Sequence, residues 1–234
     1  KVGVFSTGNE LVQSGQPLAA GQIHDSNRPT LLALARNRGF EAIDLGWLPD
    51  DPAILTKALA SSIDQVDVLL TTGGAAGGDA DLLWHVLSQP MHHQGMALPT
   101  EAHAWKLKLR PGRPLVIGRI GQTPVFGLPG NPVSAFVTFL LFVRPFVLRL
   151  QGIQVVEPQA VTLISGFDWT NPDRRREFLR AVHLPDGRLG LFRQQGSAVL
   201  TSAVVGHGLI DNPPGQTIRQ GDAVRFLSFA ELLN

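Results

Sequence analysis

Cysteine is absent from the 234-residue chain. Its absence excludes disulfide bonds, thiolate metal sites and a cysteine nucleophile, and it fits a reducing compartment. A surplus of charge is lacking too, because 20 Lys and Arg against 19 Asp and Glu give a formal net charge of +1. A near-neutral chain has no general attraction for nucleic acid, so we expect no nucleic-acid partner, and a local site must hold any anion.

The chain also lacks an uninterrupted apolar run of membrane-spanning length. Its most apolar stretch, residues 133–150, contains Arg144, Pro145 and Arg149, whereas a spanning helix needs about 20 apolar residues without such interruptions. We therefore expect a buried helix here and no membrane partner. Neither Met nor a signal peptide opens the chain, which starts directly on an apolar run at Lys1, and we expect it to be part of a longer protein.

Strand and helix patterns alternate over the first two thirds of the sequence. Apolar runs predict strands at residues 2–6, 41–48 and 66–70. Helical spacing follows the first of them and stops near Gly39, and Asp51-Pro52 is a typical N-cap and first helical position. This order predicts an α/β fold, a mostly parallel sheet with flanking helices, over residues 1–150.

The pattern changes after residue 150. Short alternating runs separated by Pro-Gly and Asp-Gly turns predict a small all-β domain over residues 151–234, a barrel or a sandwich. Residues 92–103 have no clear period, and we expect a loop or an insertion there.

Polar residues follow the predicted strands where the carboxyl ends of a parallel sheet hold ligands. The stretch Ser6-Thr7-Gly8 would let backbone N–H groups approach an anion, and Glu10 adds a carboxylate; the alternative is an ordinary turn. Asp25 and Asn27 precede a helix, where they can cap it, contact a ligand, or do both.

A glycine-rich segment follows the strand at residues 66–70. Gly73, Gly74 and Gly78 indicate a loop that cradles a phosphate or a pterin, although it is neither the dinucleotide fingerprint nor a Walker loop. Asp79 and Asp81 would then cap the next helix or bind Mg²⁺. With Asp50 at a neighbouring strand end, a magnesium site of two or three carboxylates is sterically reasonable.

Basic residues alternate between Trp105 and Pro114. In one continuous strand, Lys106, Lys108 and Arg110 would share a face, either as a solvated surface or as a stripe that neutralises an oxyanion. The later stretch Pro129-Gly130-Asn131-Pro132 precedes the long apolar helix, which Asn131 could cap.

Together these segments resemble the MoeA-type molybdopterin molybdenumtransferases, a family that includes the gephyrin E domain. The motifs that carry the resemblance lie in the family's order over about 130 residues: Phe5 to Leu11, Asp25 to Asn27, Asp50 to Pro52, Gly73 to Asp81, Arg110 to Pro114 and Gly127 to Ala135. The resemblance implies a molybdopterin-binding α/β domain, a C-terminal β domain, and a cytoplasmic homodimer completed by N-terminal domains outside this sequence.

The resemblance also implies a reaction, in which molybdate is inserted into adenylylated molybdopterin with Mg²⁺-dependent release of AMP. It assigns metal and adenylate handling to Glu10, Asp50 and Asp81. It assigns molybdate or phosphate to Lys106 and Arg110, and adds Ser197 from the β domain. The positions expected to bind the pterin substrate are Ser6, Thr7, Gly8, Asp25, Asn27, Gly73, Gly74, Gly78, Asp79, Pro129, Gly130 and Asn131.

Two other functions fit parts of the same pattern. A non-catalytic module of this fold would bind molybdopterin or a partner peptide without turnover, and the Ala75-Ala76 pair in the glycine loop favours it. A Mg²⁺-dependent pyrophosphohydrolase would use the same carboxylates but would not need the Pro129–Pro132 stretch or the β domain. Release of AMP with and without molybdate separates the three.

Overall fold

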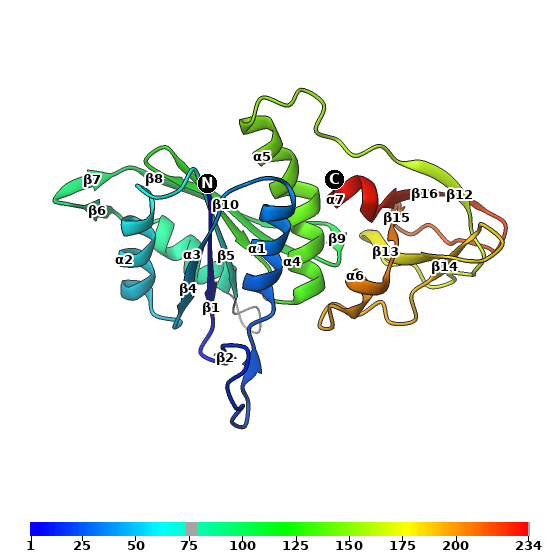
Figure 1. Ribbon diagram of the computed structural model, residues 1–234, viewed down its shortest axis with the longest axis horizontal. Helices are drawn as coiled ribbons and strands as arrows, with labels where there is room; N and C mark the ends of the chain where they lie inside the picture. Colours follow the sequence, from blue (N-terminus) through cyan, green and yellow to red (C-terminus); the bar gives the residue numbers. More distant parts are fainter. Residues whose placement is uncertain (74–78, 234) are drawn as a thin grey trace. The chain divides into compact units, whose positions relative to one another are not determined.

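The computed structural model describes residues 1–73 and 79–233 and divides into two compact units (Figure 1). The first comprises Lys1–Lys106 and Pro114–Asn131, and the second Leu107–Arg113 and Pro132–Asn234. The helical stretch from Pro132 therefore groups with the β region, against which its Phe136 ring packs edge-on to Phe229 at 5.4 Å between centroids. The domain boundary expected at residue 150 stays a prediction.

A six-stranded sheet forms the centre of the first unit, in the order β4-β1-β5-β11-β10-β8. The first four strands are parallel, and β10 is antiparallel to both of its neighbours. The predicted mostly parallel α/β architecture is thus confirmed. The strand bounds are Ala42–Leu48 for β4, Val2–Thr7 for β1, Val68–Gly73 for β5, Thr123–Leu128 for β11, Pro114–Ile120 for β10 and Thr100–Lys106 for β8.

Three helices flank this sheet: α1 (Asn27–Asn37), α2 (Pro52–Ser62) and α3 (Asp79–Leu87). Helices α2 and α3 contribute apolar side chains to one core cluster with the sheet, among them Leu55, Leu59 and Leu83. Figure 1 shows α1 on the other side of the sheet. Helix α2 begins as predicted, with Pro52 first and the Asp51 carboxylate accepting hydrogen bonds from Ala53 N and Ile54 N.

The loop expected at residues 92–103 is wrong. The chain forms a hairpin there from β6 (Met91–His93) and β7 (Met96–Leu98), and then enters β8. The hairpin turns on Gln94 and Gly95, whose φ angles of +50° and +80° suit a tight two-residue turn. Strands of three residues are too short for a period to be read from the sequence, and β8 is ordered by its pairing with β10.

The apolar stretch folds as one helical element, α4 (Pro132–Thr138), a π-helical segment (Phe139–Val143) and α5 (Arg144–Leu150). By length and composition Pro132–Leu150 could cross a membrane, but 67% of it is buried inside the protein, as the core-helix interpretation requires. The charge of Arg144 is accommodated by donation from its guanidinium to the carbonyls of Val156 and Glu231.

An antiparallel sheet, in the order β12-β16-β15-β13-β14, forms most of the second unit. A bridge between Ser165 and Leu189 joins the outer strands, so the sheet curves towards a closed barrel, as the sequence predicts. The bounds are Val161–Ile164 for β12, Ala223–Ser228 for β16, Gly208–Asn212 for β15, Arg176–His183 for β13, Leu189–Leu191 for β14, Thr201–Val205 for α6 and Phe229–Leu233 for α7.

Removal of the Asp51 cap tests the start of α2. Asp51→Ala should lower the stability of the first unit by about 1 kcal/mol, because two backbone N–H groups lose their acceptor. Asp51→Asn keeps an acceptor oxygen and should stay within a few tenths of a kcal/mol of the native chain. Urea unfolding followed by circular dichroism measures both variants, and equal losses in the two would refute the capping role.

Candidate functional site

The strands β4, β1, β5 and β11 end at one edge of the sheet, here called the carboxyl edge. Three described loops leave this edge, at residues 8–10, 49–51 and 129–131, and each contains predicted site residues; β5 ends at the same edge with Gly73. Strand β8 runs in the same direction, so Lys106 ends it at this edge too. Lys106 has no ion-pair partner among the residues that the structure describes.

The loops after β1 and β4 are held together by two reciprocal hydrogen bonds. Asn9 N donates to Asp50 Oδ2 at 3.1 Å, and Asp50 N donates to Asn9 Oδ1 at 3.2 Å. The Glu10 carboxyl folds back over Gly8, where an added Cβ would come within 2.7 Å of Glu10 Oε2. The structure thus brings the Glu10 and Asp50 loops together.

One of the two carboxylate oxygens of Asp50 accepts no hydrogen bond from the described residues. Its Oδ1 atom is buried and has no hydrogen-bond partner in the described part of the chain. A hard cation prefers carboxylate oxygen of this kind, so Asp50 suits a Mg²⁺ ligand. The third predicted carboxylate, Asp81, has its side chain outside the described residues, as does Asp79, and Gly74 and Gly78 also lie outside them.

Asp25 is almost fully buried and its carboxylate is occupied. Ser6 Oγ donates to Asp25 Oδ2 at 2.5 Å, and Arg28 donates through N and Nε to the same carboxylate. Ser26 occupies the N-cap position of α1 without a side-chain cap bond, and Asp25, one residue earlier, accepts from the early helical N–H of Arg28. Burial acts to lower the pKa of Arg28, but hydrogen bonds to Asp44 and Asp25 outweigh it and raise that pKa, so the guanidinium stays charged.

Asn27 joins the start of α1 to the end of β5 and to the loop at residues 129–131. Its Nδ2 donates to Thr72 Oγ1 at 2.9 Å and to the Gly130 carbonyl at 2.6 Å, while the Thr72 hydroxyl donates to the Pro129 carbonyl at 3.1 Å. The Asn27 Oδ1 atom is buried without a hydrogen-bond partner among the described residues. Thr72 is a member of this network that was not among the predicted site residues.

Close backbone contact explains the glycine at position 73. A Cβ there would lie 1.8 Å from the Thr7 carbonyl oxygen, so only glycine lets the ends of β1 and β5 pack this closely. The predicted residues Thr7 and Gly73 are thus direct neighbours. Asn131 immediately precedes α4, but the early N–H of Val133 donates to the Ser197 carbonyl at 3.0 Å, so a backbone carbonyl serves this group.

The continuous basic strand expected around Lys106, Lys108 and Arg110 does not form. Strand β8 ends at Lys106, and β9 (Leu109–Arg110) pairs instead with β13 in the second unit. The reason is a tight reversal in which Leu107 N donates to the Arg113 carbonyl at 2.7 Å. Arg110 Nη1 lies 3.5 Å from Asp173 Oδ2 and 3.6 Å from the buried Glu177 Oε1.

Arg180 is the buried cation that the sequence reading missed. Its guanidinium donates to Ser202 Oγ and to the carbonyls of Phe178 and Gly196, beside Ser197. Burial, together with the charge of Arg110, lowers the pKa of Arg180 to about 10. No carboxylate pairs with it within the described ranges, and an arginine inside an apolar strand was the only available signal.

Two known protein families match successive parts of the chain. Residues 3–149 match the family described as a probable molybdopterin binding domain, and residues 162–229 match the MoeA C-terminal region (domain IV). The chain belongs to the MoeA family. A crystal structure of the molybdopterin biosynthesis MoeA protein from Pyrococcus horikoshii superposes with a TM-score of 0.80 at 29% identity, covering 97% of this chain and 54% of that one.

Curated MoeA relatives agree with this assignment. The molybdopterin molybdenumtransferase of Haemophilus influenzae is 43% identical over 184 residues, which cover 78% of this chain and 43% of the relative. The protein of the same name from Nostoc is 33% identical over 202 residues, covering 84% and 44%. The chain thus spans less than half the length of these curated relatives.

Loss of the Asn27 amide should loosen the carboxyl edge. Asn27→Ala leaves the Gly130 carbonyl without this donor, and we expect a loss of about 1–3 kcal/mol in the free energy of unfolding. Asn171→Ala, which removes an exposed turn side chain, is the control and should change little. Urea unfolding compares them, and a similar loss in both variants would contradict the role of Asn27.

The dependence of unfolding free energy on acid pH tests the interaction between Asp173 and Arg175 in the second unit. Side-chain and backbone hydrogen bonds from Arg175 hold the pKa of Asp173 well below its ordinary value. A depressed folded-state pKa means that the stabilisation is complete above about pH 5 and is lost as the pH falls further. Asp173→Asn should therefore flatten the dependence of unfolding free energy on pH between about 5 and 3. Glu157→Gln is the control, and an unchanged slope in Asp173→Asn would overturn the prediction.

Proposed function

We propose that the protein inserts molybdate into adenylylated molybdopterin and releases AMP with Mg²⁺ as cofactor, acting as a cytoplasmic homodimer. Membership of the MoeA family supports the pathway and the pterin substrate. The observation that carries the reaction is the pairing of the Glu10 and Asp50 loops, with a buried Asp50 oxygen that has no partner among described residues.

The carboxylates would act by binding the metal ion. Glu10 and Asp50, with Asp81, would hold Mg²⁺, which when bound supplies positive charge next to the adenylate phosphate. The Asn9 backbone N–H fixes Asp50 Oδ2, and the Asp50 backbone N–H is held by Asn9 Oδ1, so the other carboxylate oxygen remains for a ligand. A preoriented acceptor of this kind needs little reorganisation when the ligand binds.

The basic and amide groups would handle the remaining parts of the substrates. As the family resemblance implies, Lys106 and Arg110 would neutralise molybdate or phosphate oxygens, and Ser197 would add a hydroxyl. Asn27, Thr72, Pro129 and Gly130 are joined by hydrogen bonds, and the Asn27 Oδ1 atom, which has no partner among the described residues, would accept an N–H from the substrate. Substrate groups would thus be recognised by fixed side chains.

Release of AMP from adenylylated molybdopterin tests this proposal. The complete protein is assayed with Mg²⁺, with and without molybdate, beside Asp50→Asn. We expect molybdate-dependent release in the native protein. The variant should lose about a hundredfold or more, because it lacks a charged ligand for the Mg²⁺ next to the reacting phosphate. Asp51→Asn, one residue away on the surface, is the matched control and should keep full activity.

The other outcomes identify the alternatives. Pterin binding without AMP release would leave a binding module of the same fold. AMP release at the same rate with and without molybdate would indicate a pyrophosphohydrolase. Either result contradicts the proposed transfer of molybdate.

A further inference from the structure

A separate pocket of about 600 Å³ lies beside the carboxyl edge of the first unit. Three segments form it: the start of the arm that joins β1 to α1, the turn that caps α1, and the bulged end of β4. Its size is within the range usual for small-molecule sites. The lining residues are Leu11, Val12, Gln13, Asp25, Arg28, Asp44, Leu45, Gly46 and Trp47.

Trp47 gives this pocket a fixed aromatic wall. The register of β1 and β4 shifts between Val4 and Phe5, where Gly46 adopts a φ of +87°, and a bulge of this kind re-aims the side chain that follows it. The indole N–H donates to the Gly8 carbonyl at 2.7 Å, yet the residue remains 44% exposed. An anchored and accessible indole is a surface on which a flat ring can stack.

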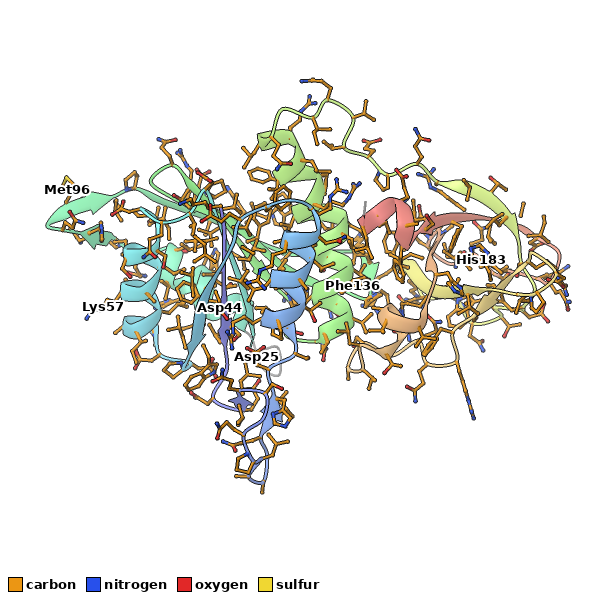
Figure 2. All side chains as sticks on the ribbon, viewed as in Figure 1. Asp25, Asp44, Lys57, Met96, Phe136 and His183 are labelled. Carbon is orange, nitrogen blue, oxygen red and sulfur yellow. The ribbon has the colours of Figure 1, made fainter. Side chains whose placement is uncertain are left out.

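The polar side of the pocket is rich in acceptors. Asp25 and Asp44 flank Arg28, whose Nη1 donates to both oxygens of Asp44, so the three groups carry a net charge of −1. The Asp25 carboxylate is 3% exposed, but that of Asp44 is 45% exposed. Gly46 N also donates to Asp44 Oδ1, so the Asp44 carboxylate has room for about one further hydrogen bond from a ligand. Figure 2 shows Asp25 and Asp44 close together at this end of the unit.

These groups match one edge of a pterin. The 2-amino group and N3–H of a pterin are adjacent donors, so this edge offers a donor, and no acceptor, to the remaining acceptor position of Asp44. Adenine instead places an acceptor, N1, beside its amino donor, so it does not match a carboxylate in this way. The negative lining also disfavours the phosphate end of a nucleotide.

The pocket shares Asp25 with the predicted site residues, and several of its other lining residues lie close to that site in the sequence. Gly8, which receives the indole hydrogen bond, precedes Asn9 and Glu10, and Trp47 lies three residues before Asp50. Ser6 on β1 donates to Asp25 in the pocket wall. A ring stacked on Trp47 would thus have the two predicted metal-binding loops beside it.

We propose that this pocket is the subsite for the pterin ring, which stacks on Trp47 and donates to Asp44. The assignment rests on the proposed function, because it supposes that the substrate is a molybdopterin. It gives the two ends of that substrate different surroundings: the pterin ring lies against the indole and the acceptor wall, and the adenylate lies by the carboxylates of the carboxyl edge.

Calorimetric titration of the complete protein with 6-hydroxymethylpterin, and separately with AMP, tests the subsite. Trp47→Ala should weaken pterin binding by about tenfold, as loss of a stacking partner does. Trp47→Phe keeps a ring and should lose less than about threefold. Trp84→Ala, a similarly exposed indole outside the pocket lining, is the control and should bind like the native protein.

The Asp44→Asn variant tests the hydrogen bond between the pterin and residue 44 without changing the indole of Trp47. It should weaken pterin but leave AMP binding unchanged, and circular dichroism checks that each variant is folded. Native affinity for pterin in both Trp47→Ala and Asp44→Asn, or no pterin binding by the native protein, would overturn the subsite.

An assay of AMP release in the same proteins keeps this proposal distinct from the function. Native, molybdate-dependent release with an unchanged KM in Trp47→Ala would refute the subsite and leave the transferase intact. Pterin binding that depends on Trp47, without any release of AMP, would support the subsite and refute the transferase.

Discussion

The hydrogen bonds of one amide side chain, Asn27, are the constraint on which the carboxyl edge depends. They join the start of α1 to the end of β5, 45 residues away in the sequence, and to the loop after β11, 103 residues away. Backbone pairing aligns these strands but does not fix the loops beyond them. A buried amide that must satisfy its donors fixes those loops in one arrangement.

The two aspartates Asp25 and Asp50 differ in how many of their carboxylate oxygens already accept hydrogen bonds. Asp25 is surrounded by donors from Ser6 and Arg28, so it stabilises the edge rather than offering free oxygen to a ligand. Asp50 is held by only one of its oxygens, and the other is buried without a partner among the described residues. The same residue type thus supports the fold at one position and suits ligand chemistry at the other.

Much of this could be predicted from the sequence because it depends on local chemistry. The parallel strands, the Asp51-Pro52 helix start and the polar loops at the strand ends follow from period, capping and topology. What could not be predicted depends on distant partners. Arg110 leaves the expected strand because β9 finds β13, and Arg180 is buried because carbonyls 2 and 16 residues away receive its donors. The strands of the β6–β7 hairpin are too short to show the alternation of apolar and polar residues by which a strand is predicted.

A structure of the complete protein with adenylylated molybdopterin bound would show which residues contact the substrate. We expect the ligand to lie along the carboxyl edge of the first unit, with its phosphate next to Asp50 and in contact with the loop at residues 129–131 that Asn27 holds. A ligand bound only to the β sheet of the second unit, with the Asn27 and Asp50 loops untouched, would contradict it.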